Sequence, residues 1–490
     1  MRAHPSRSAA VRRVFAGALI FAAAAATVRA QQMDFAELHG QALRAMNAEG
    51  IERLEFRADG WEACLGQPWS VNEGWARWEL TDYRRVLDYA SVASVQTAMR
   101  RAGMDPQRLG GCGAQPDAEP AAQQSYADAD TAWPQQLQIW LTPLGFLRLA
   151  QDNDTTLARA GDGWVVTTHV VQSGLRYELR GYYDDDIVLA RIETWIDDPV
   201  FGDMPFTAEF ADYREFDGGL RFPSSLVQKQ GGFTTLSLRV ADVVAPTTAT
   251  TDAPPRRAFR GGGASTDEAP YTRIAEGIYV INGAYQSVAV EFADYSVVID
   301  GLQSDSRAEE LIRYTKAAIP GKPIRYVIST HAHFDHANGL RQFVAEGATI
   351  ITHRMNAPFF GAALRAPRSL NPHPNENPAM PVKIEGVGDR FTINDGSGQA
   401  IELYKLGSGK HADDMLIAYL PGIRTIVEAD LLQPWINPVF GGDGDEPHPY
   451  LVYLADELER LELDYEQFVP VHRPSSPPLM SKSDLMEAVR

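Results

Sequence analysis

Three histidines and an aspartate fall within six consecutive positions of the segment THAHFDH, at His331, His333, Asp335 and His336. The chain has only 11 histidines in 490 residues, so this concentration is unusual. Imidazole nitrogens and carboxylate oxygens are the donors that zinc and similar divalent ions take. The segment directly follows an apolar strand pattern, RYVIST, and a loop at a strand end lets neighbouring side chains converge on one point. The spacing therefore predicts a metal site; the alternative is a solvated segment that carries three histidines by chance.

Further donors lie downstream in similar settings. His411 lies in a glycine-rich loop, GSGKHADD, just before an apolar strand pattern, while Asp430 ends the pattern IVEAD and His472 ends FVPVH. Side chains at the ends of neighbouring strands share one rim of a sheet. We therefore expect these three residues to join the first four in one site.

The remaining polar residues of this region are weaker candidates. Asp413 and Asp414 follow His411, and they either orient imidazole rings or are ordinary loop acids. Three other histidines are expected outside the ligand set: His353, His373 and His448.

The ordered set THAHFDH, KHADD, EAD and PVH resembles the metallo-β-lactamase fold superfamily of binuclear metallohydrolases, over about residues 271–475. The resemblance implies a four-layer αββα sandwich and two divalent metal ions. It implies that the first ion is held by His331, His333 and His411, the second by Asp335, His336 and His472, and that Asp430 bridges both. Zn²⁺ is expected, although iron and manganese accept the same nitrogen and oxygen donors.

Such a site predicts a metal-dependent hydrolase. Two divalent ions ~3.5–4 Å apart can lower the pKa of a shared water toward ~7, and the resulting hydroxide can attack a carbonyl carbon. Asp335 would act as the catalytic carboxylate that orients the nucleophile or passes a proton. The expected substrate is a small ester, lactone, thioester or similar carbonyl compound. Hydrolysis of β-lactams is the alternative, disfavoured because some β-lactamases of this fold carry cysteine or serine where Asp430 stands.

The chain around these residues alternates between strand and helix patterns, which predicts a layered hydrolase domain over residues 271–490. Apolar strands such as SVAVEF and ATIITH are separated by amphipathic helices such as SRAEELIRYTKAAI and YLVYLADELERLEL. Residues 245–270 are rich in threonine, alanine, proline and glycine and predict an exposed linker.

The N-terminal part, residues 31–244, predicts a different domain, so the whole chain is expected to be an α+β two-domain protein. Residues 76–102 show helical periodicity, whereas residues 164–244 form successive strand patterns that predict an antiparallel sheet. This sheet resembles that of periplasmic lipoprotein-carrier proteins. A periplasmic lipid- or ligand-binding carrier with a non-catalytic metal site is therefore the alternative from another functional class. His169, within a strand pattern, is expected to be a core or surface residue.

Residues 1–30 predict a secretory signal peptide, because a basic lead precedes an apolar run at 14–28 and a small-residue cleavage site after Ala30. The run is shorter than the ~18 residues that a membrane anchor needs. A periplasmic or secreted protein without a stable membrane span is expected. In such an oxidising compartment Cys64 and Cys112 are expected to pair, the alternative being two separate buried thiols.

The formal net charge is −19, and removal of residues 1–30, which hold five arginines and no acidic residue, would make it −24. A surface this acidic repels phosphate backbones, which excludes nucleic acid as the expected partner and favours a small-molecule substrate.

Overall fold

The computed structural model describes residues 33–102, 120–246, 269–377, 379–409, 411–433, 447–472 and 479–490. The predicted signal peptide, Cys112 and residues 247–268 of the predicted linker lie outside these ranges, so cleavage, the disulfide and the linker stay predictions. Among the described residues, no helix combines the length and apolar character needed to cross a bilayer.

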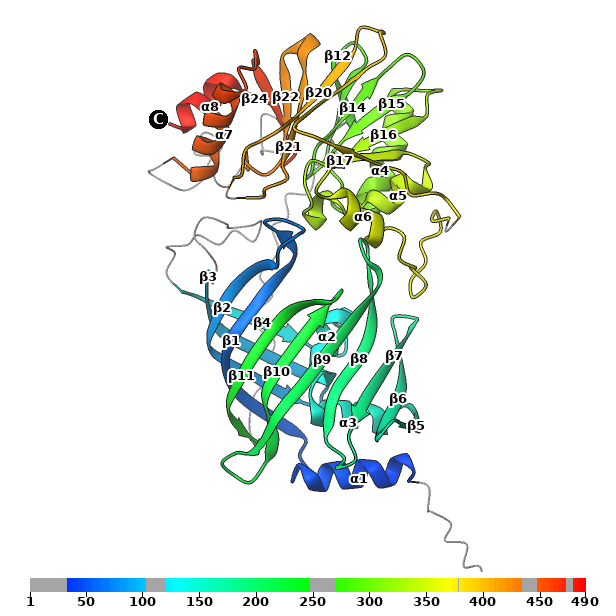
Figure 1. The fold of residues 1–490 in the computed structure, drawn as a ribbon, viewed down its shortest axis with the longest axis vertical. Helices are drawn as coiled ribbons and strands as arrows, with labels where there is room; N and C mark the ends of the chain where they lie inside the picture. The colour runs from blue at the N-terminus through cyan, green and yellow to red at the C-terminus, as the bar shows by residue number, and fades with distance from the viewer. Residues whose placement is uncertain are drawn as a thin grey trace, which may run out of the picture.

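The N-terminal part is built on one antiparallel sheet in the order β4-β3-β2-β1-β11-β10-β9-β8-β7-β6-β5, which confirms the predicted sheet and extends it toward the N-terminus (Figure 1). Its strands are β1 (Arg53–Pro68), β2 (Trp75–Asp88), β3 (Ala93–Ala102), β4 (Ala121–Ala127), β5 (Asp154–Ala160), β6 (Gly163–Gln172), β7 (Leu175–Tyr183), β8 (Leu189–Asp198), β9 (Gly202–Glu215), β10 (Arg221–Gln230) and β11 (Phe233–Val244). Pairing of β1 with β11 joins the two ends of this part of the chain.

The helix predicted within 76–102 is wrong, because these residues form β2 and β3. Asp82 has a positive φ of 51°, and the pairing of β2 with β3 shifts register between Thr81 and Arg84. Such a bulge changes which residues face the core. Leu80, Tyr83 and Leu87 are consequently all buried at spacings of three and four residues. That spacing imitates the periodicity of an amphipathic helix.

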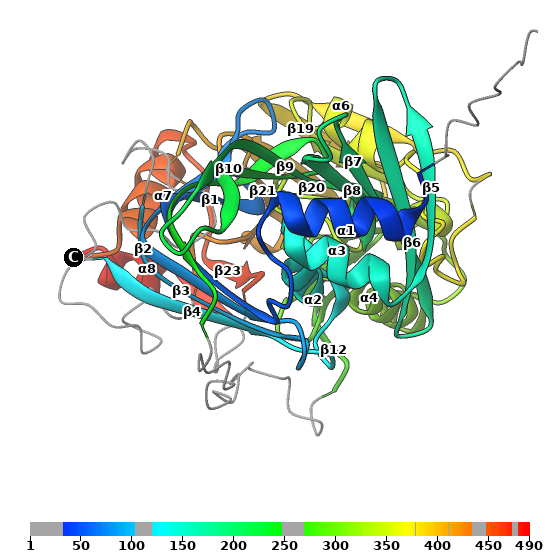
Figure 2. The ribbon, with the colours of Figure 1, turned by 90° about the horizontal axis from the view of Figure 1, so that it is seen from below.

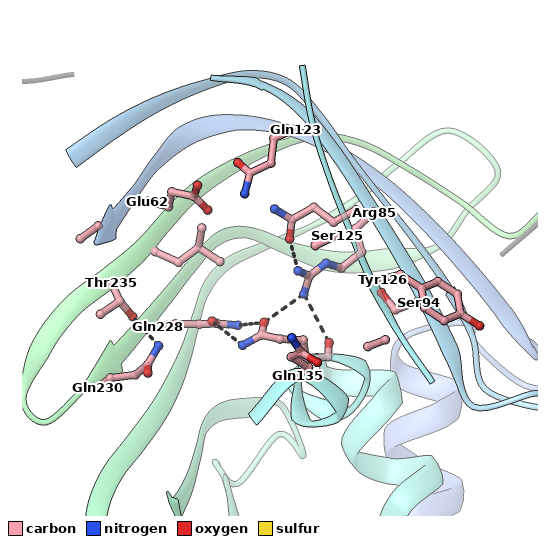
Figure 3. Close-up of a pocket in the computed structure, with 15 residues that line it drawn as sticks. Glu62, Arg85, Ser94, Gln123, Ser125, Tyr126, Gln135, Gln228, Gln230 and Thr235 are labelled. Carbon is pink, nitrogen blue, oxygen red and sulfur yellow. Dashed lines mark hydrogen bonds between the residues drawn. The ribbon is translucent and has the colours of Figure 1, made fainter. Parts of the chain in front are cut away.

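The curved sheet encloses a core that three helices complete: α1 (Phe35–Ala45), α2 (Trp133–Trp140) and α3 (Pro143–Gln151). Figure 2 shows α1 crossing the end of the sheet, with α2 and α3 inside the curve. A cavity of about 250 Å³ remains between α2 and strands β1–β4, β10 and β11. Its lining is rich in glutamine and includes Arg85, which donates to the Oε1 atoms of Gln96 and Gln138 (Figure 3). Gln138 and Gln228 also bond each other reciprocally, at 3.0 and 3.2 Å.

The C-terminal part contains two further sheets. One consists, in order, of β12 (Tyr271–Ala275), β13 (Ile278–Ile281), β14 (Ser287–Glu291), β15 (Ser296–Ile299), β16 (Ile324–Ile328), β17 (Thr349–His353) and β18 (Ile384–Val387). The other consists of β19 (Arg390–Asn394), β20 (Ala400–Lys405), β21 (Leu416–Leu420), β22 (Thr425–Glu428), β23 (Gln467–Pro470) and β24 (Met480–Ser481).

Helices cover the outer faces of both sheets, which confirms the predicted four-layer αββα sandwich (Figure 1). They are α4 (Asp305–Ala318), α5 (Leu340–Ala345) and α6 (Ala357–Ala363) on the first sheet, and α7 (Pro449–Arg460) and α8 (Lys482–Ala488) on the second. Buried valine and isoleucine side chains, such as Val290, Ile328 and Val427, fill the space between the sheets. These strands are apolar on both faces because each sheet is covered twice.

The N-terminal and C-terminal parts pack against each other. Trp75 and Phe201 contact Phe334 and Phe359 edge to face, with ring centroids 5.6–6.5 Å apart. Arg341, which is buried, donates to the carbonyls of Pro199 and Val200 at 3.1 Å. In the same interface, Arg368 pairs with Asp197 at 2.7 Å. The two parts therefore share a buried interface next to α5 and α6.

Candidate metal centre

The candidate site lies where the carboxyl ends of four strands meet, two strands from each sheet. β15 pairs in parallel with β16, and β22 pairs in parallel with β23. Asp300 follows β15, the 331–336 loop follows β16, Asp430 follows β22 and His472 follows β23. The carboxyl ends of parallel strands lie at one edge, which explains why side chains so distant in sequence converge. The loop itself is tightened by a single 3₁₀ turn, η2 (Phe334–His336).

Asp430 is the centre of the convergence, and its two carboxylate oxygens face different histidines. Oδ2 lies 2.9 Å from Nε2 of His411, 3.7 Å from Nε2 of His331 and 3.9 Å from Nδ1 of His333. Oδ1 lies 2.7 Å from Nε2 of His336 and 2.9 Å from Nε2 of His472. The seven predicted residues thus form two groups that share Asp430. In each group all donor atoms lie within 4.8 Å of one another: His331, His333, His411 and Asp430; Asp335, His336, His472 and Asp430.

Several donor atoms in this cluster have no hydrogen-bond partner within it, as expected of atoms that bind a cation. Nδ1 of His333 is buried and has no hydrogen-bond partner. Nε2 of His336 approaches Oδ1 of Asp430 to 2.7 Å, yet neither atom makes a hydrogen bond. Atoms that lie this close without hydrogen-bond geometry face a common point instead of each other. Buried polar atoms of this kind are costly unless a ligand satisfies them, so the nitrogen and oxygen donors fit divalent metal ions.

Two imidazole rings are oriented by groups behind them. Nδ1 of His336 lies 2.7 Å from Oδ1 of Asp300, and Nδ1 of His331 lies 3.0 Å from the hydroxyl of Thr330. Thr330 in turn donates to the second oxygen of Asp300. Such contacts fix the tautomer and rotation of a metal-binding histidine. Our sequence analysis missed Asp300, although it ends SVVID as Asp430 ends IVEAD.

Asp300 and Asp430 also share an uncommon backbone conformation, with φ values of 54° and 58°. Non-glycine residues in this left-handed region are strained, and such strain concentrates at functional sites. Asp300 directly follows the end of β15, and Asp430 lies two residues after the end of β22.

Asp335 differs from the other donors because its side chain is 26% exposed, against 4% for Asp430. Its Oδ2 accepts a hydrogen bond from the hydroxyl of Tyr285 at 2.9 Å, and its Oδ1 accepts one from Nε2 of Gln67 at 2.7 Å. Burial favours the protonated acid, but His336 and other histidines hold the pKa of Asp335 below its ordinary value. Burial and the charge of Asp335 raise the pKa of Tyr285, so its hydroxyl stays a donor.

The buried members of the site have opposed electrostatic tendencies. Burial lowers the pKa of His331 well below its ordinary value, which leaves a neutral ring with a free lone pair. Burial also opposes a charged His336, but Asp300 and Asp430 outweigh it and raise the pKa of His336 well above its ordinary value. Although burial disfavours an ionised Asp430, His336 and the other histidines hold its pKa well below the usual range. The site is therefore a dense array of coupled charges.

The weaker sequence candidates lie elsewhere. Asp414 is buried and accepts a hydrogen bond from Asn356, and Asp413 accepts one from Ser408 at 2.6 Å. Among the described residues, neither aspartate makes a hydrogen bond to an imidazole ring. Four histidines considered in the sequence analysis lie outside the two donor groups: His353 ends β17, His373 lies 3.5 Å from Glu309, His448 caps α7, and His169 lies 3.2 Å from Glu178 in the N-terminal sheet.

Comparison with protein families places this domain. Residues 282–472 match the model of the Metallo-beta-lactamase superfamily. The C-terminal part of the chain belongs to this superfamily. The resemblance seen in the sequence is thereby confirmed for this part of the chain.

Individual relatives are distant. One is the alpha subunit of 2,4-dinitroanisole O-demethylase from Nocardioides sp. (strain JS1661), 23% identical over 193 residues, which are 39% of this chain and 54% of that protein. This chain therefore spans about half the length of that curated relative. Solved structures that are similar include metallo-β-lactamases from Pontibacter korlensis (17% identity, TM-score 0.32, 45% of this chain and 96% of that one) and Pseudomonas aeruginosa (18%, 0.30, 44% and 92%).

Proposed function

We propose that the protein is an exported hydrolase that holds two divalent metal ions, most suitably Zn²⁺, and cleaves a small ester, lactone, thioester or related substrate. The observation that carries this proposal is the position of Asp430, whose two oxygens each face a separate group of histidines. One ion would take His331, His333 and His411, the other Asp335, His336 and His472, with Asp430 shared. Structural zinc sites are usually four-coordinate and often rich in cysteine, whereas seven nitrogen and oxygen donors around two ions suit catalysis.

When bound, divalent ions supply Lewis acidity toward the substrate and lower the pKa of a coordinated water. The chain's own residues do the rest. Asp430 and the buried histidines exclude solvent and fix the donor geometry. Asp335 remains partly exposed and ionised, so it can accept a proton at its Oδ atoms and pass it toward solvent. Tyr285 donates to Oδ2 of Asp335 and holds the carboxylate in place.

The test combines metal analysis with a hydrolysis panel on the purified protein. The panel contains a p-nitrophenyl ester, a lactone, a thioester, the β-lactam nitrocefin and 2,4-dinitroanisole. We expect about two zinc ions per chain and turnover of at least one carbonyl substrate. The double variant His331→Ala/His333→Ala should lose both, while His169→Ala should keep both, because His169 lies in the N-terminal sheet.

Each other outcome has a clear meaning. Full turnover by a metal-free protein would overturn the metal-dependent mechanism. Turnover of nitrocefin alone would make the protein a β-lactamase, and turnover of 2,4-dinitroanisole alone would move the substrate class to aryl ethers. Metal binding and co-purified lipid without any hydrolysis would favour the carrier function.

A further inference from the structure

The segment Gly66–Trp69, which comprises the last residues of β1 and the residue after it, reaches from the N-terminal sheet into the candidate metal centre. Figure 1 shows β1 and β2 rising toward the C-terminal sandwich. Gly66, near the end of β1, has a φ of 83°, and a Cβ built on it would lie 2.5 Å from the ring of Phe334. This residue is in the left-handed region that favours glycine, and it has no room for a side chain. The backbone therefore packs directly against the loop that carries His333 and Asp335.

Pro68 sets the tautomer of His333. Its carbonyl oxygen lies 2.9 Å from Nε2 of His333, which is buried. A carbonyl oxygen can only accept, so Nε2 must carry the proton and donate. The lone pair of the neutral ring is then on Nδ1, which is the atom that faces Asp430 at 3.9 Å. For His333 the N-terminal part thus supplies the orienting contact that Asp300 supplies for His336.

Gln67 acts on the neighbouring donor. Its Nε2 donates to Oδ1 of Asp335 at 2.7 Å, while Tyr285 donates to Oδ2. Both carboxylate oxygens are consequently held by neutral donors, one from each part of the chain. A carboxylate fixed this way keeps one orientation without losing its charge.

Trp69 connects the same segment to the loop that presents His411. Its indole Nε1 donates to the carbonyl of Gly409 at 2.7 Å, and its own carbonyl accepts from the backbone N–H of Asp413 at 2.8 Å. These bonds flank His411 on both sides. The four residues Gly66–Trp69 therefore contact both loops that bring histidines to Oδ2 of Asp430.

We infer that the metal centre is composite: the N-terminal part is a component of the hydrolase site, and Gln67 and the Pro68 carbonyl are positioning groups for Asp335 and His333. This inference rests on the proposed function. The N-terminal sheet is then more than a separate carrier domain, because the C-terminal sandwich alone lacks the group that orients His333 and one of the two donors that hold Asp335.

The test measures zinc binding and catalysis in the full chain. Gln67→Met keeps the length of the side chain and removes the donor; Gln67→Glu places a second carboxylate against Asp335. Gln151→Met, at the exposed end of α3, is the matched control. Zinc affinity is measured by chelator competition after metal removal, and the pH profile of kcat is recorded with the best substrate of the panel.

We expect Gln67→Met to weaken zinc binding about 10-fold or more and to displace the pH profile of kcat, with KM nearly unchanged. Gln67→Glu should have the larger effect, and Gln151→Met none. Trp69→Phe, which removes the indole N–H, should also weaken zinc binding. Wild-type affinity and an unchanged pH profile in Gln67→Met, Gln67→Glu and Trp69→Phe, with melting temperatures like that of the control, would overturn the inference. If the wild-type protein itself binds no zinc, the proposed function fails first, and the two failures are thereby distinguished.

Discussion

Two buried polar clusters in this molecule differ in how far their polar atoms find hydrogen-bond partners. The amide cluster of the N-terminal cavity consists of Arg85, Gln96, Gln138 and Gln228, whose polar groups largely bond one another. The histidine–aspartate site, made of the seven donors around Asp430, instead leaves atoms such as Nδ1 of His333 without a hydrogen-bond partner. In the first cluster only Nε of Arg85 is buried without a hydrogen-bond partner, so these four side chains largely satisfy one another. In the second, several such atoms gather around Asp430, which is expected of a site that takes a ligand.

The largest effect that tests this comparison is expected at Asp430. The substitution Asp430→Asn keeps the left-handed backbone accessible, because asparagine tolerates it, but removes the charge between the two histidine groups. We expect the rate of hydrolysis to fall at least about 10³-fold, because loss of one member of a catalytic unit removes most of the activity of the whole unit. The metal content, measured by inductively coupled plasma mass spectrometry, should fall as well. The control is Gln228→Leu in the amide cluster, and this variant should bind as much metal as the wild type. Loss of metal in the control would contradict the distinction between the two clusters.

Breaking the amide cluster should affect stability instead of metal binding. Arg85→Met removes a buried guanidinium and one donor each to Oε1 of Gln96 and Oε1 of Gln138, which keep Tyr83 and Gln228 as their other donors. Loss of one partner in such a network costs about 2 kcal/mol of unfolding free energy. Urea unfolding measures this change, and zinc content should equal that of the wild type. A stable variant that lost zinc would contradict the assignment of this cluster to the fold.

A smaller effect is expected from the group behind His336. Asp300→Asn retains an acceptor for Nδ1 of His336 but not the negative charge. Because outer contacts of this kind tune the affinity of a metal-binding histidine, zinc affinity should fall about 10-fold, or about 1.4 kcal/mol. Chelator competition detects this difference. Unchanged affinity would mean that Asp300 only shapes the turn after β15.

The smallest effect is expected in the lining of the N-terminal cavity. Burial raises the pKa of Glu62 above its ordinary value of 4.5, although Arg100 opposes this. Since the folded state binds the proton more tightly than the unfolded state, ionised Glu62 reduces stability as pH rises through and above 4.5. Glu62→Gln should therefore melt about 2 °C higher than wild type at pH 8 and at the same temperature near pH 3. Calorimetry at both pH values measures these melting temperatures. A variant that melts higher than wild type only at pH 3 would show that ionised Glu62 stabilises the fold, contrary to this prediction.

Much of the C-terminal fold was predictable because its strands and helices alternate with clear periodicity. The helix pattern at 306–319 corresponds to α4 at Asp305–Ala318, and the pattern at 348–353 to β17. The seven donors were also found in the sequence, since each lies in a short motif near a strand end. Their convergence is what the structure adds, and their role as ligands stays a prediction.

The rest depends on contacts that no local pattern encodes. The bulge at Asp82 disguised β2 as a helix, because the buried residues of the strand changed phase. Gln67 and Tyr285 reach Asp335 across 268 and 50 residues of sequence, and the essential group of Pro68 is a backbone carbonyl, which every residue possesses. Such partners are visible only once the two parts of the chain are packed together.

The contact of Pro68 with His333 joins residues 265 positions apart, so it cannot form before residue 333 has been synthesised. During synthesis the end of β1 exists long before the loop that it will support. A chain that stops before β23 also lacks His472, so the earliest and the latest segments must both be present before the centre can be complete. Metal uptake should consequently follow docking of the two parts, which makes bound zinc a marker of a fully assembled chain.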